Sequence, residues 1–387
     1  MIPIRIKGDI RDYKSQIDKL KTKIDDVIAK GYLGKRRRVT WETIESYHNN
    51  LDSSLRHKYL KKIGDGKGYD DYRSCEIEYK GRSDILAPET MLSESTIRLL
   101  KCLKDNLKRI TEAEVEELRE IIEEFQPKFS LDDQNNINRK SEEYGAVYKL
   151  FVDDTYDRSD FKDIVWKITG LKVCPYCNRT YIPFISVGNG EGEKSIKGQL
   201  DHFFPKDKYP YLAVSLYNLV PSCAYCNGPS GKHDKDPYDP SSELVSPFSL
   251  YDHKGICFIL KEFDNGIFDL DRCADSIKLG VDVSNNPQMA INEDIFHLTD
   301  VYSYHKDIAA EIIMKYCHIS SDKYIKFVKK ILNPPNAHIS QKDLLMLYWG
   351  VPISEDMLGD RPMSKFTLDL ITYLSKKKMK CNLDEMI

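Results

Sequence analysis

The 387-residue sequence has no apolar run that approaches eighteen consecutive residues, which argues against a transmembrane helix. Its first ten residues, MIPIRIKGDI, lack the charged and then apolar layout of a secretory signal peptide. No internal repeat and no long low-complexity tract is found, and a hydrophobic content of 41% is enough for a packed core. We therefore expect a cytoplasmic protein without a membrane partner.

The sequence also lacks an excess of positive charge. Its 58 Lys and Arg residues face 61 Asp and Glu residues, which gives a formal net charge of −3. A chain with this balance does not coat nucleic acid by bulk attraction, so any binding must depend on local basic patches. The run from Arg36 to Arg38 beside Trp41 is one candidate for a DNA-backbone contact, although such runs are usually solvated surface.

Apolar residues recur at three- and four-residue steps in several segments, which is the period of an amphipathic helix. This pattern predicts helices at 10–28, from Ser93 onward and at 115–125, the last preceded by a capping box from Thr111 to Glu114. The same period recurs in three further segments, at 148–168, 295–316 and 325–332.

The stretch from 171 to about 257 differs from the rest of the chain, because it is dense in Pro, Gly, Asn, Tyr and Cys and has only short β-like runs. Small metal-braced folds have this composition. The sequence thus predicts an α+β protein in which a small domain at 171–260 lies between mainly helical regions at 1–170 and 261–387.

Four of the ten cysteines form two matched pairs, Cys174-Pro-Tyr-Cys177 and Cys223-Ala-Tyr-Cys226, with 45 residues between them. Two CxxC knuckles complete a closed tetrahedral site of four thiolates, so we expect structural Zn²⁺ rather than a catalytic zinc. Zinc binding would supply much of the folding free energy of this segment. Unpaired thiols or a thioredoxin-like redox CxxC are the alternatives, and the duplication of the motif favours zinc.

Two polar motifs lie between the knuckles and run into the second of them. The first is Gln199-Leu-Asp-His-Phe-Phe-Pro-Lys206, and the second is Tyr217-Asn-Leu-Val-Pro-Ser-Cys223, after which the knuckle ends in Cys226-Asn227. This order resembles the HNH, or His-Me finger, nuclease superfamily over Cys174 to Asp236. The resemblance implies a ββα-metal domain and metal-dependent hydrolysis of phosphodiester bonds in nucleic acid.

The resemblance also implies roles for four residues. His202 is the general base that takes a proton from the attacking water, and Asp201 beside it is a ligand of the catalytic metal. Asn218 braces the loop between the two strands, and Asn227 shares the metal with Asp201. The intervals of 15 and 8 residues that separate His202, Asn218 and Asn227 are close to the usual ones in the superfamily. A histidine has the near-neutral pKa that a base requires, and carboxylate and amide oxygens suit Mg²⁺ or Mn²⁺.

One position departs from the motif. Many superfamily members carry a further His four residues after the third position, where this chain has Gly231, and the role of His233 is left open. Four lysines around the motif are expected to contact flanking phosphates, with solvated surface as the alternative for each: Lys206, Lys208, Lys232 and Lys235.

The longer string HFFPKDKYPYLAVSLYNLVPSC resembles, more loosely, the HNH proteins of Septu-type anti-phage defence systems. Such a resemblance implies an SMC-like ATPase partner and helical flanks that bind this partner or gate access of the substrate. We expect double-stranded DNA as the substrate, because it is the commonest substrate of the superfamily.

Two other classes of function stay open at this stage. A zinc-dependent adaptor could bind nucleic acid with the same fold and no catalysis, although Asp201 beside His202 has no obvious use in such a module. A zinc deaminase would need a zinc ion with an open water position, which two complete CxxC pairs do not leave.

Overall fold

The computed structural model describes residues 1–31, 33, 92–187, 194–250, 255–263, 270–319 and 340–377. Within these ranges the chain is mostly helical and has three small two-stranded sheets, which is the mixed composition that the sequence predicts. None of the described helices combines the length and the apolar character needed to cross a membrane. The basic run at Arg36–Arg38 and the helix expected at 325–332 lie outside the described residues.

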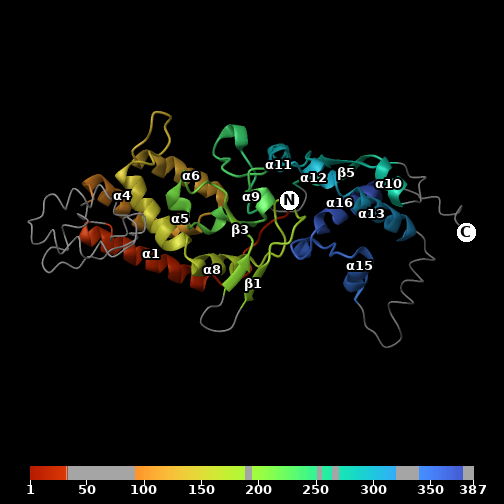
Figure 1. The fold of residues 1–387 in the computed structure, drawn as a ribbon, viewed down its shortest axis with the longest axis horizontal. Helices are drawn as coiled ribbons and strands as arrows, with labels where there is room; N and C mark the ends of the chain where they lie inside the picture. The colour runs from red at the N-terminus through yellow and green to blue at the C-terminus, as the bar shows by residue number, and fades with distance from the viewer. Residues whose placement is uncertain are drawn as a thin grey trace, which may run out of the picture.

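The first part of the chain forms a group of helices on one side of the molecule (Figure 1). These elements are α1 (Arg11–Lys30), α4 (Glu94–Asp105), α5 (Leu107–Glu112), α6 (Val115–Phe125), the short 3-10 turn η2 (Gln126–Lys128), α7 (Glu142–Val147), the π-helical segment η3 (Tyr148–Tyr156) and α8 (Ser159–Thr169). Two helices end on glycines in the left-handed conformation, α1 at Gly31 and α8 at Gly170, where a side chain would be strained.

The start of α6 corrects one prediction. The helix begins at Val115 as expected, but its N-cap residue Glu114 makes no side-chain cap. Thr111 lies inside α5 instead, where its hydroxyl donates to the carbonyl oxygen of Leu107 at 2.8 Å. The predicted capping box is therefore wrong, because residues 107–112 form a short helix of their own.

The middle of the chain carries two hairpins and a short helix. Strands β1 (Phe184–Val187) and β2 (Lys194–Lys197) pair antiparallel, and so do β3 (Gln199–His202) and β4 (Leu219–Ser222). The second pair places His202 opposite Leu219 at its end, and α9 (Ala224–Asn227) follows β4 directly. In the loop from β3 to β4, the chain makes the 3-10 turns η4 (Pro210–Leu212) and η5 (Leu216–Asn218).

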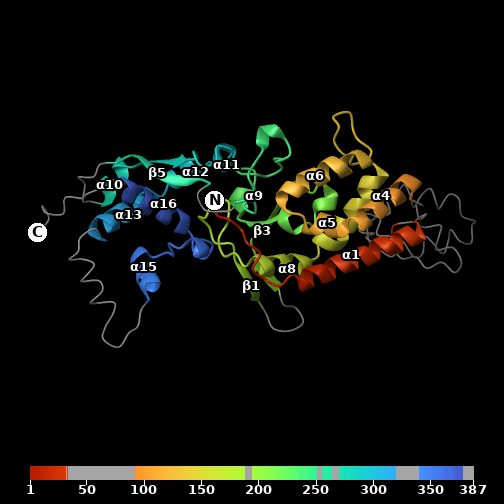
Figure 2. The same ribbon diagram turned by 180° about the vertical axis from the view of Figure 1, so that it is seen from behind.

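The last part of the chain packs one hairpin against helices. Its elements are β5 (Cys257–Glu262), α10 (Leu270–Ser276), β6 (Lys278–Asp282), α11 (Met289–Phe296), α12 (Leu298–Ser303), α13 (Lys306–Ile319), α15 (Gln341–Trp349) and α16 (Ser364–Lys376), with the 3-10 turns η6 (Pro240–Ser242) before them and η7 (Glu355–Met357) among them. Strands β5 and β6 are antiparallel, and α13 and α16 lie beside each other in both ribbon views (Figures 1 and 2).

Both helical parts reach the central hairpins, which lie between them in the two views (Figure 2). From α1, the buried hydroxyl of Tyr13 donates to the carbonyl oxygen of Val214 at 2.7 Å, in the loop between β3 and β4. From α12, the hydroxyl of Tyr302 donates to the carbonyl oxygen of Cys177 at 2.6 Å. Buried apolar residues from all three parts form one continuous core, and the predicted domain boundaries stay a prediction.

Candidate functional site

The two CxxC knuckles bring their four sulfur atoms together. The Sγ atoms of Cys174, Cys177, Cys223 and Cys226 all lie within 4.8 Å of one another, and those of Cys177 and Cys223 are 4.0 Å apart. Tetrahedral zinc with Zn–S bonds of about 2.3 Å requires sulfur separations of about 3.8 Å. The four buried sulfurs thus fit a structural zinc ion, and their closed set leaves no position for a reacting water.

Backbone hydrogen bonds shape each knuckle around its sulfurs. The N–H of Arg179 points at the sulfur of Cys177 at 3.4 Å, and the N–H of Cys226 points at the sulfur of Cys223 at 3.5 Å. Such N–H groups stabilise the negative charge of a thiolate ligand. Neighbouring Cys174 also lowers the pKa of the Cys177 thiol through a hydrogen bond, which favours the form that binds metal.

His202 lies at the end of β3 with its ring fixed in one orientation. Its Nε2 atom is 3.1 Å from the carbonyl oxygen of Ala213, and because a carbonyl only accepts, Nε2 carries the hydrogen. In the neutral ring the lone pair is then on Nδ1. The ring of Tyr156 meets the imidazole edge-on, with centroids 4.4 Å apart, and the histidine is only 8% exposed.

Burial also decides the charge of His202. Desolvation, assisted by the positive charges of Lys206, Lys232 and Lys162, lowers its pKa from the usual 6.5 to about 3. The hydrogen bond to Ala213 acts in the opposite direction and is outweighed. His202 is therefore neutral near pH 7, and its lowered pKa makes Nδ1 a weaker base in this arrangement than the near-neutral histidine that the sequence predicts.

Asn218 fastens the loop that leads from β3 to β4. Its Oδ1 atom accepts the N–H of Phe204 at 2.7 Å, while its Nδ2 group donates to the carbonyl oxygens of Phe204 at 3.1 Å and Leu212 at 3.0 Å. The side chain is fully buried, so each of these bonds replaces water that cannot enter. Leu212 is followed directly by Ala213, whose carbonyl oxygen accepts the hydrogen bond from the His202 ring, so Asn218 holds the segment of the loop that contains this acceptor.

Asp201 belongs to a buried network that ties the first knuckle to β3. Its Oδ2 atom accepts a hydrogen bond of 2.6 Å from the hydroxyl of Tyr176, which stands between the two cysteines of that knuckle. Its Oδ1 atom is 3.0 Å from Nζ of Lys232, and the same ammonium donates to the carbonyl oxygen of His202 at 2.8 Å. Burial, together with the charge of Asp201, raises the pKa of Tyr176 well above its usual value, so its hydroxyl stays a donor.

This network bears on two of the expected roles. Lys232 is completely buried, so the phosphate contact expected of it has no support in the structure. Both oxygens of Asp201 are bound to protein groups and its side chain is 3% exposed, while the amide nitrogen of Asn227 donates to Oε1 of Gln199 at 2.9 Å. As they lie, Asp201 and Asn227 do not form a site that fits a divalent metal ion.

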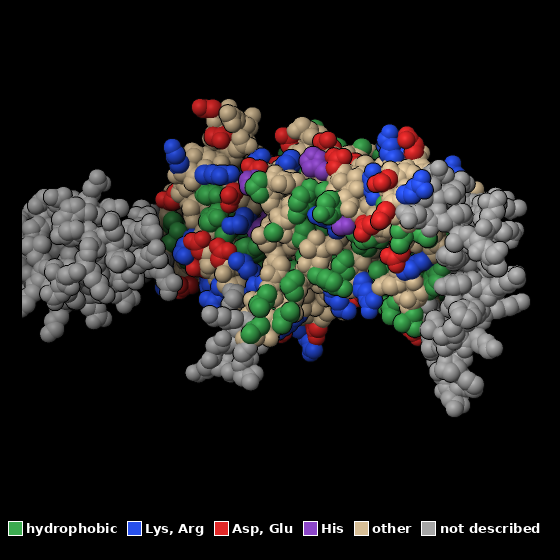
Figure 3. Space-filling view, turned by 45° about the vertical axis from the view of Figure 1, so that its right-hand side comes forward, with side chains coloured by type: hydrophobic (Ala, Val, Ile, Leu, Met, Phe, Trp, Pro, Cys, Tyr) green, Lys and Arg blue, Asp and Glu red, His purple; other side chains and the backbone are tan. Residues whose placement is uncertain are grey.

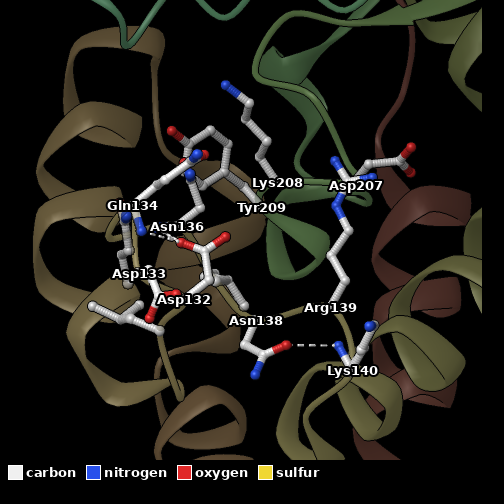
Figure 4. A pocket seen from close by; sticks show the side chains of 13 residues that line it. Asp132, Asp133, Gln134, Asn136, Asn138, Arg139, Lys140, Asp207, Lys208 and Tyr209 are labelled. Atoms are coloured by element: carbon white, nitrogen blue, oxygen red, sulfur yellow. Dashed lines mark hydrogen bonds between the residues drawn. The ribbon is translucent and has the colours of Figure 1, made fainter.

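The other three expected lysines are each engaged with a protein group. Lys206 is part-buried and donates to the hydroxyl of Tyr148, whereas Lys235 donates to the carbonyl oxygen of Gly231. Lys208 pairs with Asp236 at 3.1 Å. It also lines a pocket of about 740 Å³, where the carboxylates of Asp132, Asp133 and Asp207 are drawn with it (Figure 4).

Two further features belong to the surroundings of the site. His233 is exposed, and its Nδ1 atom is 2.8 Å from a carboxylate oxygen of Asp234, so it takes no part in the buried network. On the molecular surface, acidic and basic side chains are interspersed over the face that Figure 3 shows, without a wide patch of one sign. This agrees with the near balance of charges in the sequence.

Sequence reasoning missed Tyr156 and Tyr176. The first comes from η3 in the helical part, 46 positions before His202, and no local pattern connects the two. Tyr176 lies between the two cysteines of the Cys-Pro-Tyr-Cys knuckle. Its position between two expected metal ligands could have indicated that it lies close to the site.

The fold and the site together define a mostly helical protein with small sheets and a four-cysteine cluster that fits structural zinc. Among curated proteins, the chain is similar to the Septu protein PtuB of Bacillus thuringiensis, with 52% identity over 42 residues. The similarity covers 11% of this chain and 16% of PtuB, so the chain matches only a small part of that relative. No protein-family model and no solved structure matches the chain.

Proposed function

We propose that this chain is an HNH-type endonuclease that hydrolyses phosphodiester bonds in nucleic acid, with His202 as the general base. The observation that carries the proposal is the hydrogen bond from Nε2 of His202 to the carbonyl oxygen of Ala213, because it leaves Nδ1 as the basic atom of a neutral ring. The HNH motif of the sequence, with His202, Asn218 and Asn227 at the usual intervals, supports the same assignment.

The proton transfer follows from this tautomer. Nδ1 accepts a proton from a water molecule as the water oxygen attacks the phosphorus, and the bond from phosphorus to the sugar oxygen breaks, with the leaving oxygen taking up a proton from solvent. The resulting imidazolium is held by the carbonyl oxygen of Ala213, whose negative end favours a charged donor. Asn218 contributes by fixing the loop that contains Ala213, so it is a positioning residue.

The HNH resemblance implies Mg²⁺ or Mn²⁺ on Asp201 and Asn227, which would neutralise charge on the phosphate when bound. The arrangement of these residues does not fit the ion, since Asp201 already pairs with Lys232 and accepts a hydrogen bond from Tyr176. We therefore assign Asp201 to the internal network with Lys232 and Tyr176.

The biological setting that we propose is anti-phage defence. It is supported by the short similarity to the Septu protein PtuB and by the Septu-like string around His202. An ATPase partner of the SMC-like kind, with double-stranded DNA as the substrate, is the arrangement that this setting implies.

A second function is favoured by one observation. His202 is 8% exposed and Asp201 is engaged by Lys232, which is the state expected of a binding module without catalysis. In that case the chain would be a zinc-dependent adaptor that binds nucleic acid in a defence complex.

Cleavage of plasmid DNA by the purified chain separates the two functions. The reaction contains Mg²⁺ or Mn²⁺, with EDTA in a parallel sample, and compares the parent chain with His202→Ala and His233→Ala. We expect nicking by the parent and by the His233 variant, since His233 is exposed and outside the network, and none by the His202 variant. Binding of DNA without nicking by a folded, zinc-loaded parent would support the adaptor instead.

A further inference from the structure

A second, smaller cavity lies beside His202 and has no acidic lining. It has a volume of about 280 Å³ and is bounded by α8, by the junction of β2 and β3 and by the end of α9. Apart from Gly198 and the apolar Leu200, its walls are basic, amide or aromatic residues: Lys162, Lys197, Gln199, Asn227, Tyr156 and Trp166. A cavity with these groups and no carboxylate suits an anion with several oxygen acceptors.

The cavity is adjacent to the proposed base. Tyr156, one of its walls, contacts the imidazole of His202 edge-on with centroids 4.4 Å apart. Gln199 and Leu200 line it from β3, the strand that ends at His202. The Tyr156 ring and strand β3 thus connect this cavity to His202, which makes it the candidate site for a phosphate next to the one at His202.

Two lysines supply its positive charge. Nζ of Lys162 lies 4.6 Å from the centre of the Tyr156 ring and 3.1 Å from a carboxylate oxygen of Asp157. Lys197, on β2, pairs with Asp163. Neither carboxylate lines the cavity, and both pairs are partly exposed, so each is worth little to stability and can yield to a phosphate.

Neutral donors complete the walls. The indole Nε1 atom of Trp166 is buried and has no hydrogen-bond partner among the described residues. Gly198 lets the strand junction approach this indole closely, because a Cβ atom there would be 3.0 Å from Trp166 and 3.1 Å from the carbonyl oxygen of Ser222. The Nδ2 group of Asn227, which now donates to Gln199, is a further donor within the cavity.

The larger pocket at Lys208 does not offer this chemistry. Carboxylates of Asp132, Asp133 and Asp207 line it together with Arg139, Lys140 and Lys208, and the acidic groups, unlike the walls of the smaller cavity, repel phosphate (Figure 4). Of these two cavities, the smaller one is therefore the better match for a nucleic-acid backbone.

We propose that the cavity between α8 and the β2–β3 junction binds a backbone phosphate of DNA next to the one that is cut, with Lys162 and Lys197 as its cationic contacts. This inference rests on the proposed function and deepens it, because it assigns part of the nucleic-acid contact to the helical part outside the HNH motif. It also replaces Lys232 by two partly exposed lysines that the sequence motif did not contain.

The test measures binding and cleavage of a labelled DNA duplex by the full chain at several salt concentrations. Variants are Lys162→Ala, Lys197→Ala and the double variant, with Lys167→Ala as the matched control, since Lys167 is an exposed lysine of the same helix and does not line the cavity. Each cavity variant should weaken binding by about threefold to tenfold and reduce the slope of log K against log salt by about 0.9, as the loss of one phosphate contact requires. The control should match the parent, and Lys162→Arg should retain most of the affinity.

If folded Lys162 and Lys197 variants bind DNA with the affinity and the salt dependence of the parent, the phosphate site is overturned. Cleavage of DNA by the parent would in that case still support the proposed nuclease function. If the parent binds DNA without cutting it and the two variants bind DNA more weakly, the phosphate site is supported and only the proposed nuclease activity is rejected. A parent that neither binds nor cuts DNA would overturn both. Melting temperatures confirm that each variant is folded before its affinity is compared.

Discussion

The ammonium of Lys232 donates to the carbonyl oxygen of His202 at 2.8 Å, inside the protein and away from solvent. The same group pairs with Asp201 at 3.0 Å, and the backbone N–H of Lys232 donates to the carbonyl oxygen of Cys226 at 2.8 Å. One buried lysine thus connects the second zinc knuckle to the strand that carries the proposed base. It acts on His202 through the backbone, so we regard it as a positioning residue.

Replacement of Lys232 tests this connection. In Lys232→Met, the carboxylate of Asp201 stays buried without its cation, and we expect a loss of about 3–5 kcal/mol in the free energy of unfolding. The double variant Lys232→Met with Asp201→Asn should lose less than the single variant, because no unpaired charge is left. Urea unfolding measures both, and a single variant within about 1 kcal/mol of the parent would show that the pair is unimportant.

The loop between β3 and β4 should depend on Asn218. In Asn218→Ala, the N–H of Phe204 and two carbonyl oxygens lose their buried partner, which should cost about 2–4 kcal/mol in the free energy of unfolding. Because this loop holds Ala213, cleavage should fall in the variant even at temperatures where it is folded. Normal cleavage by a destabilised variant would mean that the loop does not orient His202.

Zinc should be required for the folded state of the central segment. Metal analysis of the purified chain should find about one zinc ion per chain, and removal of zinc by a strong chelator should lower the melting temperature. Cys226→Ser should bind zinc more weakly, whereas Cys102→Ser, which is outside the cluster, should not. Full zinc content in the Cys226 variant would contradict the four-sulfur site.

Burial of His202 predicts how stability depends on pH. Its pKa is about 3 in the folded protein and near 6.5 in the unfolded chain, so between these values the unfolded state binds more protons. Stability therefore falls as pH falls from about 6.5 toward 3. His202→Gln removes this contribution, which is at most about 2 kcal/mol at pH 5, and urea unfolding at pH 7 and pH 5 measures it. An equal loss in parent and variant would mean that the pKa of His202 is not lowered.

The local features of the sequence predicted much of the architecture. The periodic segments at 10–28 and 148–168 are helical and are followed by the C-cap glycines Gly31 and Gly170, and the helix expected from Ser93 onward begins there, with the Ser93 hydroxyl as its cap. The repeated CxxC spacing predicted the four-cysteine cluster, because that pattern depends only on the chemistry of the metal.

The burial of Lys232 and the approach of Tyr156 to His202 could not be predicted in the same way. Each depends on packing between residues 30 or more positions apart, and a lysine beside a glycine and a histidine has the composition of a solvated loop. The capping pattern at Thr111 failed because a short helix ends there, which the sequence pattern does not distinguish from a cap. The hydrogen-bond partners of the site thus depend on tertiary contacts that the sequence does not reveal, whereas the four cysteine ligands could be predicted from their spacing in the sequence.

The most direct test of the central claim is the single-turnover rate of DNA cleavage by His202→Gln. The glutamine amide can still donate to the carbonyl oxygen of Ala213, so the fold is retained while the basic Nδ1 atom is lost. If His202 is the general base, the variant should be folded and bind DNA but cleave it about 10²- to 10⁴-fold more slowly than the parent. A variant that cleaves within about threefold of the parent would contradict the assignment of His202 as the general base.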